Sequence, residues 1–223
     1  PGDWVLKDTI HGGTLQIATG ESLTVASGTR NSRLDSVTVV GDIDLVNATL
    51  RLKDVVIDGR VNLPDTIYHG YASLAFEGTQ TLGGHAEIVS TDTGGYYYNT
   101  LEMLGEGELT LGADVRVHGS ALNIGAALTS GAVALQRLVN LGTIEADTGT
   151  VQVLADDFRN EGIAKASGGS LNLSSANISS GSSGQFHIGD GTFNLGGTFD
   201  TTDFGGFVAS GGVVNFNGTV ENS

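Results

Sequence analysis

The sequence predicts an all-β fold, a single-stranded parallel β-helix (β-solenoid) with about 21 residues per coil. Three observations lead to this prediction: glycines recur at a nearly fixed spacing, apolar-polar-apolar triplets follow them, and helical periodicity is absent from the repeats. The composition agrees. The 223 residues include 35 glycines and only 2 prolines, which favours many tight turns between short strands.

Two series of glycines repeat in the C-terminal part of the chain. The first comprises Gly142, Gly162, Gly184 and Gly205, and the second comprises Gly149, Gly169, Gly191 and Gly212. The sequence numbers of successive members differ by 20, 22 and 21 in both series. Self-similarity at such a period indicates a stacked architecture in which each repeat is one structural unit.

Apolar residues recur at fixed distances from these glycines. One column is Ile144, Ala164, Phe186 and Phe207; a second is Val151, Leu171, Phe193 and Val214; a third is Leu138, Phe158, Ile178, Phe199 and Val220. In an apolar-polar-apolar triplet both apolar side chains lie on one face of a strand. Each unit therefore holds three short strands, which is too small for a propeller blade of ~40 residues and fits one coil of a parallel β-helix. Each strand would then pair with its equivalents about 4.8 Å above and below, and the apolar columns would fill a shared interior.

The N-terminal half shows the same triplets less regularly, for example Leu23-Thr24-Val25 and Ile43-Asp44-Leu45. The segment that starts at Gly78 aligns with the segment that starts at Gly107. This alignment matches Leu82 to Leu111 and Ile88 to Val117. Because the offset between the two segments exceeds one coil, we expect the surplus to form a bulge at positions 91–100.

We expect one elongated solenoid over residues 1–223, with irregular coils over 1–124 and regular coils over 138–223. Residues 125–136 (GAALTSGAVALQ) have a helix-tolerant composition, so a junction between two styles of coil is expected at 125–137. The chain stops directly after the third-strand position Val220 without a polar cap. We therefore expect a fragment of a larger protein, with open solenoid ends that favour self-association.

Charge and hydropathy exclude two classes of partner. The chain has 25 acidic and 10 basic residues, and its formal charge of −15 disfavours nucleic acids and anionic membrane surfaces. Its apolar runs stay far below the roughly 20 residues that span a bilayer, so we expect no membrane insertion of this segment. The absence of cysteine is compatible with an exported protein.

Two consecutive coils, LVNLGTIEADTGTVQVLADD (138–157) and FRNEGIAKASGGSLNLSSAN (158–177), carry a family resemblance. They resemble the β-strand repeats of large bacterial surface proteins, namely filamentous-haemagglutinin-like adhesins and autotransporter passenger domains. The resemblance covers 138–223 well and 12–120 loosely. It implies a right-handed β-helix, an extracellular or cell-surface location, and a role in attachment, aggregation or biofilm formation. Such repeats are diagnostic of architecture and weak for specific function.

The leading functional hypothesis is a structural or adhesive β-helical stalk of a large exported bacterial surface protein, and not an enzyme. Two alternatives stay open: a polysaccharide-degrading enzyme or phage-type depolymerase on the same fold, and a self-assembling filament subunit. An enzyme would need clustered carboxylates beside a basic residue. The nearest candidates are Asp42 and Asp44 with Arg51, and Asp54 and Asp58 with Arg60. We assign no catalytic residue, because a solvated β-helix face carries outward charges in any case.

The sequence lacks a metal-binding motif. The five histidines, His11, His69, His85, His118 and His187, are dispersed, and we expect them at the surface. Neither an EF-hand loop nor the GGxGxDxUx nonapeptide is present. Asp156, Asp157 and Asp190 fall in expected bends, where aspartate also serves turn geometry, so calcium stays open without a supporting motif. We assign no cofactor and no metal.

Two further features are candidates for a ladder and for recognition. Gln152, Asn172, Asn194 and Asn215 form an outward row, in which stacked amides are expected to bond along the solenoid. Tyr96, Tyr97 and Tyr98 lie in a glycine-flanked segment, and three consecutive side chains cannot all face a core. At least one exposed ring would suit a cell-surface glycan or protein, and the alternative is that the rings cover the side of the coil.

Overall fold

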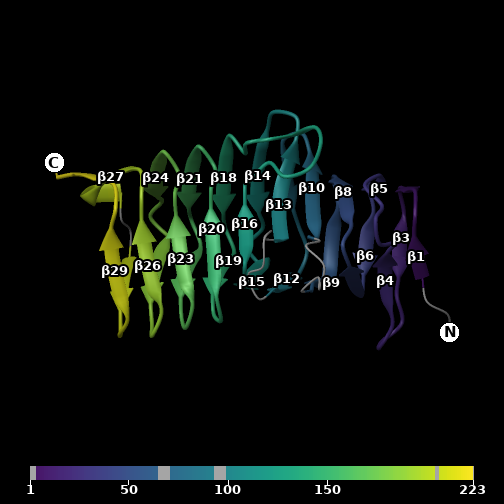
Figure 1. Cartoon of the computed structure of the whole chain (residues 1–223), viewed down its shortest axis with the longest axis horizontal. Helices are drawn as coiled ribbons and strands as arrows, with labels where there is room; N and C mark the ends of the chain where they lie inside the picture. The colour runs from purple at the N-terminus through teal and green to yellow at the C-terminus, as the bar shows by residue number, and fades with distance from the viewer. Residues whose placement is uncertain (1–3, 65–70, 93–98, 204–205, 223) are drawn as a thin grey trace.

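In a computed structural model the chain is a stack of parallel β-strands wound into coils, with the two termini at opposite ends of the long axis (Figure 1). The structure describes residues 4–64, 71–92, 99–203 and 206–222. Each strand bonds to strands one coil away, and three sheets form the walls of the tube. The parallel β-helix expected from the repeat is confirmed.

The first sheet runs from one end of the stack to the other. Its main path is β1 (Trp4–Leu6), β4 (Ser22–Val25), β7 (Asp42–Leu45), β9 (Val56–Leu63), β12 (Ala86–Thr91), β15 (Arg116–Ser120), β19 (Thr143–Ala146), β22 (Ile163–Ala166), β25 (Gln185–Ile188) and β28 (Gly206–Ala209). Off this path, β3 (Thr14–Gln16) pairs with β6 (Thr38–Val40), which pairs with β9. The long strand β9 therefore serves two walls, since its first residues pair with β6 and its last residues pair with β7.

The second and third sheets complete the cross-section. The second follows β2 (Thr9–His11), β5 (Ser32–Asp35), β8 (Thr49–Lys53), β10 (Ser73–Glu77), β13 (Asn99–Leu104), β16 (Leu122–Ile124), β20 (Thr150–Val153), β23 (Ser170–Leu173), β26 (Thr192–Leu195) and β29 (Val213–Phe216), with β17 (Ala132–Val133) beside β13. The third follows β11 (Gln80–Leu82), β14 (Glu108–Leu111), β18 (Arg137–Asn140), β21 (Asp157–Asn160), β24 (Asn177–Ser180), β27 (Thr198–Asp200) and β30 (Thr219–Glu221). A 3-10 turn, η1 (Thr201–Asp203), follows β27.

The register agrees with the columns read from the sequence. In the first sheet the pairing runs Ile144, Ala164, Phe186, Phe207, and in the second it runs Val151, Leu171, Phe193, Val214. The looser N-terminal alignment also holds, because Leu82 pairs with Leu111 and Ile88 pairs with Val117. Insertions between coils therefore leave the strands aligned.

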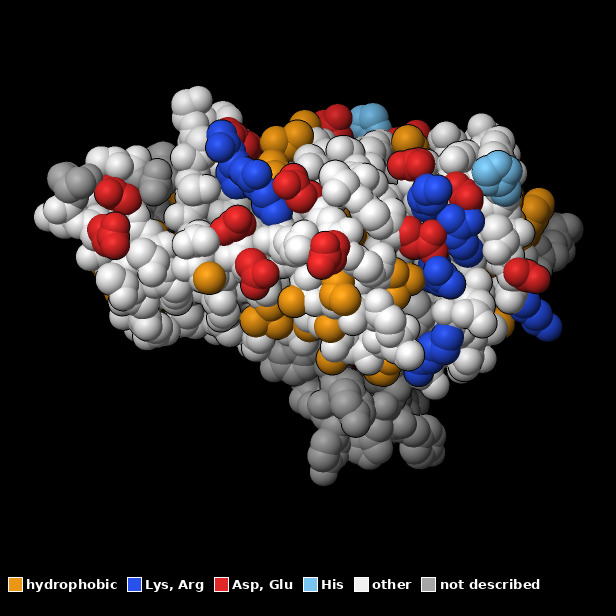
Figure 2. Space-filling view, turned by 90° about the horizontal axis from the view of Figure 1, so that it is seen from above, with side chains coloured by type: hydrophobic (Ala, Val, Ile, Leu, Met, Phe, Trp, Pro, Cys, Tyr) orange, Lys and Arg blue, Asp and Glu red, His pale blue; other side chains and the backbone are white. Residues whose placement is uncertain are grey.

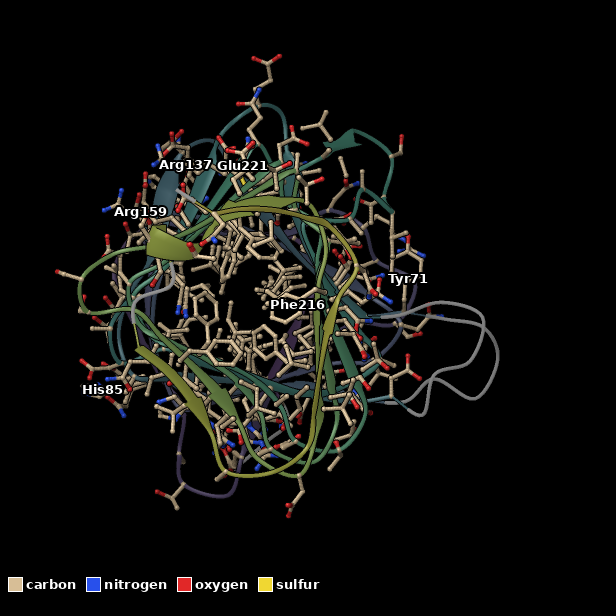
Figure 3. All side chains as sticks on the ribbon, turned by 90° about the vertical axis from the view of Figure 1, so that its left-hand side faces the viewer. Tyr71, His85, Arg137, Arg159, Phe216 and Glu221 are labelled. Atoms are coloured by element: carbon tan, nitrogen blue, oxygen red, sulfur yellow. The ribbon has the colours of Figure 1, made fainter. Side chains whose placement is uncertain are left out.

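The apolar columns from all three sheets meet in one interior. Phe186, Phe193 and Phe199 belong to different sheets, and each is at most 2% exposed. The rings of Phe186 and Phe193 meet edge to face, with 5.7 Å between their centroids. Figure 3 looks along the tube and shows the apolar side chains gathered inside it. Each fully buried side chain of this size contributes roughly 1.5–3 kcal/mol.

The repeating glycines lie where successive coils approach most closely. A Cβ atom on Gly169 would lie 2.1 Å from the carbonyl oxygen of Gly149, and one on Gly162 would lie 2.2 Å from that of Gly142. Real Cβ atoms do not come so close to a backbone oxygen. Shortage of space between coils therefore explains the glycine periodicity.

The segment between β16 and β18 is an insertion against the second sheet. Residues 125–136 contain the short strand β17, and no helix forms there. Strand β17 pairs antiparallel with β13, whereas every other named strand pair in the described part of the chain is parallel. Residues 129–131 of this insertion line a hollow on the surface of the second sheet.

Candidate functional site

The outward faces of the N-terminal coils carry interleaved charges. Figure 2 shows basic and acidic side chains side by side toward the N-terminal end of the molecule. Strand alternation explains their placement, because the residues between two inward apolar side chains point outward. Two clusters and one hollow stand out on these faces.

The first cluster joins three coils of the second sheet. Arg33 on β5 and Arg51 on β8 are in register, and both bind Glu77 on β10. The Arg33 Nη2 to Glu77 Oε2 distance is 2.8 Å, and the Arg51 Nη2 to Glu77 Oε1 distance is 2.7 Å. Arg33 also binds Asp35 at 2.7 Å. Burial raises the pKa of Glu77, but the hydrogen bond from Arg33 and the charge of Arg51 outweigh it and lower that pKa overall.

The second cluster surrounds His118 on the first sheet. The imidazole lies between two carboxylates, with Nδ1 2.7 Å from Asp147 Oδ2 and Nε2 3.1 Å from Glu87 Oε1. Arg116, two residues earlier on β15, bridges Glu87 at 3.2 Å and Glu145 at 2.9 Å. Residues from three successive coils therefore form one charge network.

Glu145 is the most perturbed acid of this network. Its side chain is 8% exposed, and its carboxylate binds Lys165 Nζ at 2.9 Å as well as Arg116 and the Ser167 hydroxyl. Burial raises the pKa of Glu145, but the hydrogen bonds from Ser167, Lys165 and Arg116 outweigh it and lower that pKa from 4.5 to about 2. Glu145 is therefore a charged anchor at neutral pH, and a general acid would need the opposite shift.

A hollow of about 540 Å³ opens on the second sheet beside the first cluster, with which it shares Arg51. Its lining includes Arg30, Thr49, Arg51, Tyr71, Thr129 and Ser130. The Arg30 guanidinium carbon lies 4.7 Å from the centre of the Tyr71 ring. Figure 3 shows Tyr71 on the opposite side of the tube from Arg137 and Arg159. The hollow is thus a polar surface feature containing two cations and an aromatic ring.

The carboxylates predicted as the nearest catalytic candidates do not converge with their expected arginines. Asp44 accepts hydrogen bonds from Ser22 and Asn62, and Asp42 accepts one from the backbone N–H of Arg60 at 2.9 Å. Arg51 instead lies on the second sheet and binds Glu77. The expectation was that a neighbouring coil brings Arg51 or Arg60 close to Asp42 and Asp44. It is wrong for Arg51, which belongs to a different wall, whereas Arg60 lies on the neighbouring strand of the same wall and contacts Asp42 through its backbone N–H.

The second set of candidates, Asp54 and Asp58 with Arg60, does not converge on one site either. Asp58 binds His85, with 3.1 Å between Oδ1 and Nδ1, and the backbone and side-chain hydrogen bonds from His85 lower the pKa of Asp58. Asp54 has a positive φ of 52°, and its backbone N–H donates to Gln80 at 3.0 Å. Arg60 lies 4.0 Å from Glu87. Asp54 therefore serves a turn, and Asp58 and Arg60 each contact a different partner, so the three side chains do not form one site.

The surface expectation for the histidines holds in part. His11 and His85 are largely exposed and face Asp35 and Asp58, and His187 contacts Gln185 at 2.8 Å. The expectation is wrong for His118, which is only 8% exposed because coils on both sides supply carboxylates that enclose it. His69 lies outside the described residues.

The four residues of the amide row are in register on the second sheet. Gln152 pairs with Asn172, Asn172 with Asn194, and Asn194 with Asn215. Asn194 Nδ2 donates to Asn172 Oδ1 at 2.6 Å, and Asn215 Nδ2 donates to Asn194 Oδ1 at 2.7 Å. The expected binding residues Tyr96, Tyr97 and Tyr98 lie outside the described residues, so their recognition role stays a prediction.

Sequence reasoning missed a second, inward set of amides. Asn140 and Asn160 are fully buried, and Asn140 Nδ2 donates to Asn160 Oδ1 at 2.8 Å. Each also donates to a backbone carbonyl of the next coil, Asn140 to Ile163 and Asn160 to Gln185. A usable signal was present, since both asparagines stand at the same place after the third apolar column, one repeat apart.

The described residues offer no ready-made metal site, since no group of three or more His, Asp or Glu side chains is arranged to hold an ion. Within the same part of the chain, no helix is long and apolar enough to cross a membrane. Comparison with protein-family models, with curated protein sequences and with solved structures finds no match to this chain.

Proposed function

We propose that this chain is a structural, adhesin-like stalk segment of a large exported bacterial surface protein, located outside the cell. The observation that supports it is the unbroken in-register stack from β1 to β29, in which every coil bonds to the next. In a solenoid of this kind the length is set by the number of coils, because each coil stacks on its neighbours through hydrogen-bonded ladders in three sheets. In this role the solenoid is a rigid spacer that projects away from the cell, and its outward surfaces make the attachment.

The charged clusters favour this role over catalysis. The carboxylates of Glu77 and Glu145 are bound by cations from neighbouring coils, so they join coils together. A catalytic acid or base must remain free to exchange a proton with a substrate. The coil repeats resemble those of filamentous-haemagglutinin-like adhesins and autotransporter passenger domains, and this resemblance agrees with a surface role.

One observation sustains the alternative of a polysaccharide-degrading enzyme. His118, Glu87 and Asp147 converge on an outward face beside Arg116, which is a mixture of groups that acid–base chemistry uses. Incubation with neutral and acidic polysaccharides, followed by assays for new reducing ends and for unsaturated uronates, tests it. Release of oligosaccharides that is lost in His118→Ala would replace the stalk proposal by this one.

The stalk role is tested by changing the number of coils. Residues 158–177 form one complete repeat unit, so their duplication keeps every column in register. We expect five extra copies, placed between a surface anchor and an epitope on a host cell, to raise the epitope by about 24 Å, at about 4.8 Å per coil. Super-resolution imaging of epitope height measures this.

The matched control deletes residues 158–167 alone, which is half a coil and breaks the register. We expect this variant to lose its β-sheet circular dichroism, whereas deletion of 158–177 keeps it. An epitope height that does not change with coil number would refute the stalk role. End-to-end association of the 1–223 polypeptide stays a separate proposal, and a strict monomer in sedimentation at high concentration contradicts it.

A further inference from the structure

We propose that the hollow on the second sheet binds an acidic saccharide through its carboxylate or sulfate group. The hollow is the surface lined by Arg30, Thr49, Arg51, Tyr71, Thr129 and Ser130. The inference goes beyond the stalk role and does not depend on it, because all these residues lie outside the coil at 158–177 used to test the stalk.

The hollow is positively charged in an otherwise acidic chain. The chain carries a formal charge of −15, yet the described lining of this hollow includes two arginines and no carboxylate. Among the described residues, no Asp or Glu side chain lies within ion-pair distance of Arg30. Because Arg30 has no carboxylate partner in the described part of so acidic a protein, its guanidinium is available to an anion from outside.

The two arginines are also held in place before a ligand arrives. The Arg30 guanidinium stacks over the Tyr71 ring at 4.7 Å and approaches Thr49 Oγ1 with Nη1 at 3.4 Å. Glu77 holds Arg51 through Nε and Nη2, each 2.7 Å from Oε1, which leaves Nη1 without a described partner. Guanidinium groups fixed in this manner suit carboxylate and sulfate oxygens, and little side-chain entropy remains to be lost.

The opposite wall of the hollow is fixed by a buried acid. Glu102 on β13 is 1% exposed and accepts hydrogen bonds from the backbone N–H groups of Leu128 and Thr129 at 2.9 and 3.0 Å. It also accepts bonds from the hydroxyls of Thr129 and Ser73. Glu102 therefore anchors the 126–131 loop, and its carboxyl oxygens accept four hydrogen bonds from the protein itself. The loop contributes the hydroxyl-bearing residues Thr129 and Ser130 to the lining.

The size and polarity of the hollow favour a sugar as the carrier of the anion. A volume of about 540 Å³ lies within the ordinary range for small-ligand sites, roughly 300–1,000 Å³. The Ser130 hydroxyl and the acceptor side of the Thr129 hydroxyl match the hydroxyls of a saccharide, and the Tyr71 ring adds an apolar body with a polar tip. A free inorganic anion would use the arginines alone.

The test titrates the whole chain by calorimetry with four probes: a tetragalacturonate, a sulfated tetrasaccharide, a neutral tetrasaccharide and inorganic sulfate. We expect one or both acidic saccharides to bind and the neutral one not to. Arg30→Gln removes a side chain that lines the hollow and should weaken binding at least about tenfold, the loss of one charge-assisted hydrogen bond. Tyr71→Ala should weaken it several-fold because it frees Arg30.

The matched control is Arg159→Gln, which removes one positive charge from an exposed site on the third sheet that pairs with Glu161. Its affinity should stay within about twofold of the wild type, since the hollow is untouched. Equal losses in Arg30→Gln and Arg159→Gln would overturn the proposal, because they would indicate nonspecific attraction. It also fails if the neutral probe or inorganic sulfate binds as well as the acidic saccharides, or if neither acidic probe binds at millimolar concentration.

Discussion

The coils before residue 138 and the coils after it share one cross-section but differ on their outer faces. In the earlier coils, charged side chains join neighbours, as in the Arg33–Glu77 and Arg116–Glu87 pairs. This charge network ends in the first regular coils, where Glu145 binds Arg116 and Lys165. After Lys165 the sequence contains no lysine or arginine, and the Asn172–Asn194–Asn215 ladder takes the corresponding place. Both regions keep the inward apolar columns, so the interior defines this fold and the outer faces are free to differ.

The number of residues per coil also differs between the two regions. Partners in the C-terminal coils are separated by 20 to 22 residues, whereas Ala72 and Asn99 are bonded across 27 residues. Longer coils accommodate insertions such as 125–136, which builds a wall of the hollow. The irregular half therefore holds the features that could recognise a ligand, and the regular half is nearly uniform. Four predictions test this division.

The largest effect is expected in the phenylalanine cluster of the regular coils. Phe193→Ala removes a fully buried ring that contacts Phe186 and Phe207, and it should lower the free energy of unfolding by about 3–5 kcal/mol. Urea unfolding followed by circular dichroism measures the change. Because a solenoid is stabilised by nearest neighbours, hydrogen exchange should show the lost protection in β23, β26 and β29 and not in β5 or β8.

Phe216→Ala is the matched control for that change. Phe216 is 58% exposed, so its truncation should cost less than about 1.5 kcal/mol. Equal losses in the two variants would show that burial in the column does not set the stability. Protection lost evenly along the chain in Phe193→Ala would show that the regular and irregular coils unfold as one unit.

The next effect concerns close approach between coils. Gly169→Ala puts a Cβ atom 2.1 Å from the Gly149 oxygen, so adjacent coils must move apart at an overpacking cost of about 1–3 kcal/mol. Gly83→Ala is the comparison in the irregular half, where the nearest atom, on Val56, is 3.7 Å away. We expect a melting temperature close to the wild type for Gly83→Ala and a clear decrease for Gly169→Ala. Equal melting temperatures would show that glycine spacing does not reflect coil contact.

Acid should separate the coils up to Lys165, which contain all the basic residues, from the coils after it. The lowered pKa of Glu145 means that its charged form stabilises the fold, a contribution complete above the unfolded value near 4.5 and lost as pH falls toward about 2. The pKa values of Glu77 and Asp35 are lowered in the same direction by Arg33 and its neighbours. The expected loss for Glu145 is about 1–2 kcal/mol, after reduction for the partly exposed cations that bind it. Hydrogen exchange at pH 7 and pH 3 should show protection lost first in β5 to β19.

Glu145→Gln provides the control for the acid experiment. It should be less stable than the wild type at pH 7 and should lose less additional stability between pH 5 and pH 3, because the titrating carboxylate is gone. Parallel stability curves for the two proteins would show that Glu145 is not the group responsible. Residues 170–222 should keep their protection in both proteins down to pH 3.

The same division explains how much the sequence could predict. In the regular coils a constant spacing fixes which residues are neighbours, so the fold, the register and the row from Gln152 to Asn215 follow from alignment. In the irregular coils the spacing varies, and the encounter of His118 with Glu87 and Asp147, 31 and 29 residues away, has no periodic signal. The hollow depends in addition on how the 126–131 loop folds back onto β13, which a strand pattern cannot show.

The smallest effect is expected for the outward amide ladder. Asn194→Ala removes one hydrogen bond to Asn172 and one from Asn215, but these partners can bond to water, so the cost should be about 0.5 kcal/mol. Asn160→Ala offers the contrast, because it strips a buried donor from the Gln185 carbonyl and a partner from Asn140, at about 1–3 kcal/mol. Urea unfolding of both variants against the wild type decides between them. Should Asn194→Ala cost as much as Asn160→Ala, the outer ladder would hold the coils together as firmly as the core does, and the outer faces would not be free to vary.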